Sequence, residues 1–501
     1  ATGEGLAGAS VSVRGTTGGT NTDSAGAFTI NVPATATTLS VSYVGFAAQE
    51  VVVSPEQTNL IITLQPSGAT LDQVVVVGYG TQRRRDLTGS VASVRGAELA
   101  KQPVQTATQA VQGRVAGVQV ITSGQPNALP TVRVRGTGTM LGGAEPLYVV
   151  DGVITTDIRN INTSDIVSMD ILKDASATAI YGMRAANGVL LITTKKGRTG
   201  RLQIAYDANV GIREATNLVD MAGPAQYANY LNEASVYYGS GDSLVPSSRL
   251  AGGQHTDWYD AILRRGFQQN HNVSLSGGSE SITYFFSAGY LSDEGILQTN
   301  KLDRFTLRSN NEYKLSKMLT LSSLVSYAHT RLRNANLGVF NDAYRAAPYV
   351  PAKVGNRYGN TSEAGNVGNP LLQLEKADNR LLGNRLQGTF ALDFKPIKDL
   401  TLRSSMGIDL EFNRSTAYGY QFFSDTNTFI TPGGNQQVGR SSLGISNNEA
   451  TRWVWDNTAT YSRRFNNHNL TVLAGVTAEA YRFNELFGQR FDVPANRDQW
   501  F

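Results

Sequence analysis

Residues 201–213, RLQIAYDANVGIR, alternate between apolar and polar side chains along their whole length. Successive side chains of a β-strand point to opposite faces, so a period of two is typical of a strand with one apolar and one polar face. The stretch therefore predicts such a strand, with its apolar members at Leu202, Ile204, Tyr206, Ala208, Val210 and Ile212.

The same alternation returns at eight later places, which gives nine expected strands of roughly 10–16 residues. Their clearest parts are 273–275, 282–290, 305–307, 319–321, 390–394, 400–412, 453–461 and 470–476.

The connections between these strands alternate in length. Those at 214–266, 331–379 and 415–447 are long and the one at 293–301 is moderate, whereas those at 277–280, 315–317, 395–398 and 465–468 are short. Transmembrane β-barrels have short turns at the periplasmic end and long loops at the extracellular end. A soluble sandwich or solenoid has no need of this asymmetry, and it remains the alternative.

A barrel has to close, because an open strand edge cannot be left in lipid. Nine is an odd number, and a barrel whose lumen holds a separate domain needs about 22 strands. We therefore expect that the sequence ends before the barrel is complete.

Composition agrees with this class and argues against others. Charged residues are 17% of the chain, below the roughly 25% of typical soluble domains. The net charge of +4 and the absence of a basic block longer than 83–85 give no basis for nucleic-acid binding. There is no cysteine, and the four histidines are far apart in sequence, so we expect no metal, no cofactor and no enzyme activity.

The first 197 residues precede the strands and differ from them. Residues 1–66 contain short apolar runs separated by turn residues, including 26–33 and 60–66, and predict a small β-sandwich. Residues 67–80 form a linker that ends in the octet QVVVVGYG, and 81–197 predict a compact α+β unit with helices near 104–112 and 177–181. The fold class is thus mainly β: a β-sandwich, an α+β domain, and the first strands of a transmembrane β-barrel.

Five charged residues on the polar faces of the strands are candidate contacts for a solute or for a domain in the lumen. They are Asp207, Arg213, Arg403, Asp409 and Glu411. The aromatic residues of the apolar faces, such as Trp453 and Trp455, fit lipid contact better than a sugar-stacking surface.

Four ordered motifs resemble one family. LDQVVVVGYGTQRRRDLTGSVASV, ALPTVRVRGTGT, EPLYVVDGV and SMDILKDASATAIYGMRAANGVLLITTKKG are similar to the plug of SusC/RagA-type TonB-dependent outer-membrane transporters, over residues 72–197. Residues 1–66 resemble a carboxypeptidase-regulatory-like domain whose first strand is expected to precede Ala1.

The resemblance implies an importer of oligosaccharides or peptides, with a 22-stranded barrel, a plug in its lumen (81–197) and a periplasmic N-terminal domain. Its implied partners are TonB with ExbB–ExbD, a SusD-like surface lipoprotein, outer-membrane lipid and a second transporter–lipoprotein pair. The residues that match the family's Ton box are Asp72, Gln73, Val74, Val75, Val76, Val77, Gly78, Tyr79 and Gly80. Gln73 stands where glutamate is common, which removes a charge but keeps the backbone and the valines.

We interpret the octet as a strand kept available for another protein's sheet. The alternative is that it pairs within this chain. A binding or adhesion protein and a signal-transducing receptor are the competing functions, and a plain adhesin needs neither a plug nor a Ton box.

Overall fold

The computed structural model divides the chain into two units, 1–88 and 89–501. It describes residues 5–13, 19–32, 38–43, 46, 49–53, 59–64, 74–77, 80–83, 91–99, 101, 104, 106–138, 143–239, 245, 247–251, 253, 255–363, 367–466 and 468–494.

The first unit is built around a four-stranded antiparallel sheet. Its order is β2-β1-β3-β4, with bounds Gly19–Asn21, Ser10–Val13, Thr38–Ser42 and Gln49–Val52. Val11 and Val13 are buried, whereas Ser10 and Ser12 between them are exposed. The described parts of 26–33 and 60–66 are not strands, which corrects that prediction. Every second side chain of these segments is apolar and packs against the core. The alternation therefore predicted correctly which side chains are buried, although the backbone is not hydrogen-bonded as a strand.

The octet forms half of a hairpin. Strand β5 (Val74–Val77) pairs antiparallel with β6 (Gly80–Arg83), so Val77 lies opposite Gly80 and Val74 opposite Arg83. The described residues of the octet therefore pair within this chain, which is the alternative that the sequence left open. Its use as a strand for another protein's sheet stays a prediction. Pairing across a two-residue connection has a small loop-closure cost, and polar residues such as those of β6 suit an edge strand. Asp72, Gln73, Gly78 and Tyr79 lie outside the described residues.

The second unit begins with a five-stranded mixed sheet. Its order is β11-β10-β13-β12-β7, with bounds Val153–Thr155, Leu147–Val150, Val189–Thr194, Ile166–Leu172 and Val91–Arg95; β10 and β13 are parallel. A separate hairpin joins β8 (Val118–Ile121) to β9 (Thr131–Val134). The short helices are α1 (Gly96–Leu99), η2 (Gln109–Val111), η3 (Thr163–Asp165), α2 (Ala175–Thr178) and η4 (Ala179–Ala185).

Helices were the weakest part of the prediction in this domain. Of the expected helix at 104–112 only the single turn η2 is helical among the described residues. Asp174 precedes α2, at the position where an aspartate often caps a helix, but its side chain makes no capping hydrogen bond and pairs with Arg135. Both faces of the sheet are buried, through Met169 and Ile171 on one face and Leu191 on the other, so core packing outweighs local propensity here.

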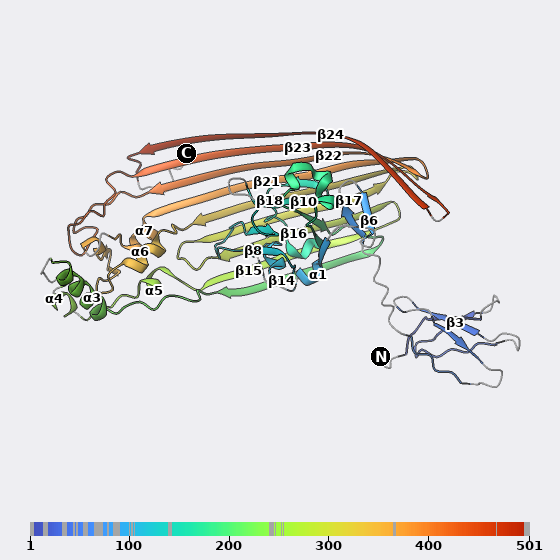
Figure 1. The fold of residues 1–501 in the computed structure, drawn as a ribbon, viewed down its shortest axis with the longest axis horizontal. Helices are drawn as coiled ribbons and strands as arrows, with labels where there is room; N and C mark the ends of the chain where they lie inside the picture. The colour runs from blue at the N-terminus through green and yellow to red at the C-terminus, as the bar shows by residue number, and fades with distance from the viewer. Residues whose placement is uncertain are drawn as a thin grey trace. The chain divides into compact units, whose positions relative to one another are not determined.

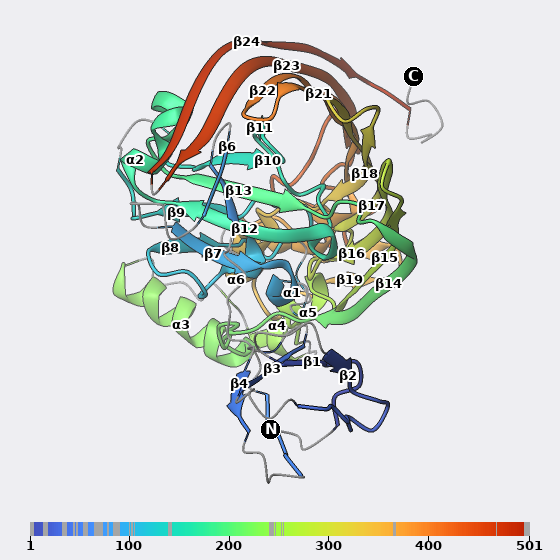
Figure 2. The ribbon, with the colours of Figure 1, turned by 90° about the vertical axis from the view of Figure 1, so that its right-hand side faces the viewer.

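The nine predicted strands form one antiparallel sheet in sequence order. The first five are β14 (Gly200–Arg213), β15 (Gly266–Gly278), β16 (Ile282–Glu294), β17 (Lys301–Lys314) and β18 (Leu319–Asn334), and the last four are β21 (Ala377–Ile397), β22 (Leu400–Gly419), β23 (Ser442–Phe465) and β24 (His468–Phe491). The last four have 20 to 24 residues and exceed the expected length. Figure 2 shows this sheet curving around the five-stranded sheet.

The long connections are folded and lie at one end of the sheet, opposite the tight turns (Figure 1). They contain α3 (Pro224–Tyr237), α4 (Ser247–Leu250), α5 (Trp258–Ile262), α6 (Val339–Arg345), β19 (Lys353–Val354), β20 (Arg357–Tyr358), η5 (Thr361–Glu363) and α7 (Pro370–Glu375). Helices of 214–265 and 335–376 share one apolar core, which we name the cap core. Within the described residues, no helix has the length and apolarity needed to cross a membrane.

Candidate functional site: the interface between the inner domain and the strand wall

Two parts of the second unit meet here: residues 89–197, which we name the inner domain, and the nine-stranded sheet, which we name the wall. The tip of the β10–β11 hairpin of the inner domain makes an ion pair with the wall. Asp151 and Gly152 have φ of 48° and 90°, as a two-residue hairpin turn requires. The Asp151 carboxylate accepts hydrogen bonds from the backbone N–H of Thr194 at 3.0 Å and from its hydroxyl at 2.6 Å. It also pairs with Arg308 of β17, whose Nη2 lies 2.5 Å from Oδ2. Both side chains are buried, so the negative charge of Asp151 and the positive charge of Arg308 compensate each other out of contact with water.

A second contact centres on Arg385 of β21, which is 5% exposed. Its guanidinium lies 2.6 Å from Asp409 of β22 and 3.6 Å from Asp157 of the inner domain. It also donates to the hydroxyl of Thr155 at 2.7 Å. The candidate residues Asp409 and Glu411 therefore face the lumen. Asp409 accepts a hydrogen bond from Thr155 of the inner domain, whereas Glu411 is connected to that domain only by way of its ion pair with Arg385.

In a third contact, arginines of the wall donate hydrogen bonds to backbone carbonyls of the inner domain. The candidate residue Arg213 donates to the carbonyl of Gly124 at 2.9 Å and pairs with buried Asp293 of β16 at 3.2 Å. Arg304 of β17 donates to the carbonyl of Arg159 and to the side chain of Asn127. The wall thus holds the inner domain by arginines at four positions on three elements of its sheet.

Two candidate residues, Asp207 and Arg403, make no hydrogen bond or ion pair to the inner domain among the described residues. Asp207 is exposed and lies opposite Asn272 in the register of β14 and β15. Arg403 pairs with Asp393 at 3.0 Å near the end with tight turns. A solute-binding role for any of the five candidates stays a prediction.

Sequence reasoning missed Arg304, Arg308 and Arg385, together with their partners in the inner domain. A signal was present, because the alternation that assigns Leu307 to the apolar face assigns Arg308 to the polar one. Their partners lie 114 to 230 residues away in the chain, and one sequence gives no register between the domains.

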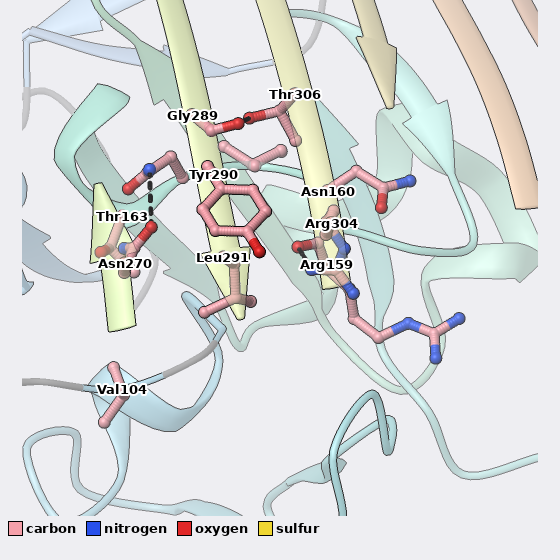
Figure 3. A pocket seen from close by; sticks show the side chains of 12 residues that line it. Val104, Arg159, Asn160, Thr163, Asn270, Gly289, Tyr290, Leu291, Arg304 and Thr306 are labelled. Carbon is pink, nitrogen blue, oxygen red and sulfur yellow. Dashed lines mark hydrogen bonds between the residues drawn. The ribbon is translucent and has the colours of Figure 1, made fainter. Parts of the chain in front are cut away.

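A small polar hollow lies at this interface. The turn 159–163 forms one side and β15, β16 and β17 form the other (Figure 3). Asn162 donates to Asn270 across it at 3.5 Å, and its volume of about 20 Å³ is enough for one water molecule. The described residues contain no group of three histidine or acidic side chains that could hold a metal.

Two carboxylates of the inner domain have pKa values shifted in opposite directions. Burial raises the pKa of Asp165, although Ser287 and Asn272 of the wall donate hydrogen bonds to it. Burial also acts on Asp157, but the hydrogen bonds and charge of Arg159, with the charge of Arg385, outweigh it and lower its pKa.

These shifts predict opposite pH responses. A raised pKa means that the stabilisation from Asp165 is complete below its ordinary value of 3.8 and is lost as the pH rises through the folded value. Asp165→Asn stays neutral, so its melting temperature relative to the unchanged protein is expected to rise as the pH is raised above 3.8. Thermal unfolding followed by tryptophan fluorescence measures this difference.

Asp157→Asn is the matched control. Its carboxylate stabilises above the ordinary value of 3.8 and loses that effect as the pH falls through the lower folded value. The cost of Asp157→Asn is therefore largest near pH 7 and shrinks in acid. Parallel pH profiles for the two variants would contradict the assignment.

Comparison with known proteins agrees with this arrangement. Residues 1–76 match the carboxypeptidase-regulatory-like domain and residues 83–189 the TonB-dependent receptor plug domain. The chain is 35% identical to TonB-dependent receptor P26 of Formosa agariphila over 95% of its own length and 48% of that relative. It is 37% identical to TonB-dependent receptor SusC of Bacteroides thetaiotaomicron over 62% of its own length and 31% of that protein.

Among solved structures, the RagAB peptide importer in its open-open state resembles the chain with a TM-score of 0.71 and 27% identity, over 84% of this chain and 50% of that one. The chain spans about half the length of the curated relatives that match nearly all of it.

Proposed function

The chain belongs to the SusC/RagA-type TonB-dependent receptors, and from this we propose that it forms the plug-gated part of an outer-membrane importer energised by TonB. The inner domain of 89–197 is then the plug and the curved sheet is the barrel wall. The observation that carries the proposal is the set of buried polar contacts by which wall arginines hold the plug in the lumen. A protein that only binds at its surface has no use for such an occluded lumen.

The strength of these contacts explains why import needs energy. Removing one partner of a buried ion pair costs about 3–5 kcal/mol, because the other charge stays buried without compensation. Moving the plug separates Asp151 from Arg308 and Asp157 from Arg385 in one step. An external pull transmitted through the chain supplies work that solute binding alone does not.

The hairpin β5–β6 suits a coupling role because one edge stays open. In a hairpin closed by two residues the pair next to the turn exchanges both hydrogen bonds, and the following pair directs its backbone groups away. Val76 and Thr81 are that following pair. A strand of TonB can therefore add to β5 at Val74 and Val76 without opening the hairpin.

We propose oligosaccharides or peptides as cargo and a SusD-like lipoprotein as partner at the cap. The RagAB peptide importer, to which the chain is similar, supports the peptide class. The similarity to SusC and to RagAB supports the lipoprotein partner. The names of the relatives are those of receptors and importers, in accord with a protein that is not an enzyme.

Deleting residues 72–80 from the full-length protein tests the proposal. Uptake of the cognate solute is expected to be lost while binding at the cell surface is retained, because the cap and the plug are unchanged. Retained uptake in cells with intact TonB would contradict energised import. Lost binding would instead favour a direct role of this segment in holding the solute.

A sharper pair of variants separates backbone pairing from side-chain chemistry. Val76→Pro removes an outward N–H of the open edge, whereas Val76→Thr keeps the branched shape and the N–H. Only the proline variant is expected to lose uptake.

A further inference from the structure

The outward face of the wall changes character toward the end that carries the cap. On β22 the outward positions from Leu402 to Phe412 are uncharged: Leu402, Ser404, Met406, Ile408, Leu410 and Phe412. They span about 33 Å of strand at roughly 3.3 Å per residue, and a tilt of about 40° reduces this to the ~25 Å height of a membrane apolar band. Position 414, the next outward residue, is an arginine.

Basic residues continue at this level on the neighbouring strands. The register aligns Arg414 with Leu382, Arg331 and the acidic Asp303. One step further toward the cap it aligns Arg380 with Arg333 and Lys301, and Lys301 lies 3.8 Å from Glu294. All lie on the face opposite to Arg308 and Arg385, which point to the plug. We name Arg331, Arg333 and Arg380 the arginine row.

The arginine row places like charges directly opposite each other, which is unfavourable in an antiparallel sheet. Arg333 lies opposite Arg380 on one side and opposite Lys301 on the other. One carboxylate, Asp378, which is 1% exposed, lies 2.6 Å from Arg380 and 3.4 Å from Arg333. A single buried anion thus orients two arginines whose side chains are 42% and 37% exposed.

Arg331 is held differently. Its Nε donates to Nε2 of His329 at 3.2 Å, and Nδ1 of that histidine is 2.9 Å from the side-chain oxygen of Asn384. This chain fixes the plane of an exposed guanidinium. No ion pair joins Arg331 to a carboxylate within the part of the chain that the structure describes.

We propose that the arginine row binds a phosphate group of a phosphorylated glycolipid in the outer leaflet of the membrane. The proposal rests on the outer-membrane location proposed above. The row lies directly above the apolar band, at the depth where headgroup phosphates lie when acyl chains cover that band. Guanidinium groups match phosphate oxygens with two parallel hydrogen bonds. A bound phosphate also removes the repulsion along the row.

Native mass spectrometry of the full-length protein in neutral detergent, titrated with diphosphorylated lipid A, tests this. Arg331→Gln leaves the pairs of Asp378 intact and is expected to weaken binding about fivefold, a typical increment for one basic residue near an anionic surface. Replacing all three arginines with glutamine is expected to weaken it on the order of a hundredfold. Arg463→Gln is the matched control, because Arg463 is an outward, 53% exposed arginine of β23 near the opposite end of the strands. It is expected to bind lipid A as the unchanged protein does.

Two further arms decide the source of the phosphate. Lipid A without phosphates is expected to bind at least tenfold more weakly than the diphosphorylated form. Equal binding of the two forms would show that the acyl chains alone hold lipid A on the protein, and would overturn the proposal. Inorganic phosphate in millimolar excess is expected to leave lipid A bound, and displacement would assign the row to free phosphate. Wild-type affinity of Arg331→Gln would also overturn the proposal. None of these outcomes depends on transport, so they are distinguishable from failure of the proposed function.

Discussion

Replacement of Arg385 by methionine is expected to lower the free energy of unfolding by about 3–5 kcal/mol, among the largest effects of any single change in the wall. Arg385 faces Asp409, Asp157 and Glu411 at 2.6, 3.6 and 3.9 Å. Methionine keeps much of the side-chain volume but leaves the buried Asp409 without its arginine partner, whereas Asp157 keeps its ion pair with Arg159. Denaturant unfolding in detergent, followed by tryptophan fluorescence, measures the loss.

Arg403→Met provides the comparison. Arg403 also pairs with an aspartate across neighbouring strands, but its side chain is 45% exposed, and exposed pairs contribute only about 0–1 kcal/mol. Adding Asp409→Asn to Arg385→Met is expected to restore part of the stability, because it removes the uncompensated charge. Equal effects of Arg385→Met and Arg403→Met would show that burial does not strengthen the contact.

The same substitution separates the fold of the wall from the seating of the plug. Arg385 touches the plug through Thr155 and Asp157, so its loss is expected to weaken plug attachment as well. If Arg385→Met raises the permeability of the outer membrane while strand content is unchanged, the contact holds the gate closed. The charge of Asp409 would then serve the wall mainly by orienting Arg385.

The wall could be predicted from sequence because one physical rule governs all of it. Lipid on one face and a polar lumen on the other impose a period of two on each strand, so Leu202 and Ile204 already reveal the pattern. No comparable rule fixes the pairing of short segments. The polar segment that begins at Thr81 carries no apolar alternation, yet Thr81 lies opposite Val76 in a hairpin.

The plug and its contacts were harder for the same reason. Met169 and Ile171 are buried in a sheet covered on both faces, so an alternating pattern does not mark the strand. The polar face of the wall could be assigned by parity, which is why Arg213 and Asp409 were found. Which of these residues contacts the plug depends on how the plug and the wall pack together. That packing is determined by the side chains of both parts and cannot be inferred from the pattern of either one.

Replacement of Trp258 by alanine is expected to disrupt the cap core with a loss of about 3–5 kcal/mol in its local stability. Trp258 opens α5 in the connection 214–265 and is 2% exposed. Its indole N–H donates at 3.1 Å to the carbonyl of Ala347, in the connection 335–376. The side chain therefore fills the cap core and joins its two halves.

The expected result is local. The strands are held by their own ladders, so melting of the wall changes little, whereas proteolytic cleavage within 214–265 and 335–376 accelerates by at least about a hundredfold, in proportion to the open population. Trp258→Phe keeps most of the ring and loses the hydrogen bond, at a cost of about 1–3 kcal/mol. Cleavage at the unchanged rate in Trp258→Ala would show that the connections fold independently of each other. If solute binding falls with the accelerated cleavage while the wall stays intact, the cap core is a preorganised part of the binding surface, since loops that are disordered before binding would not need it.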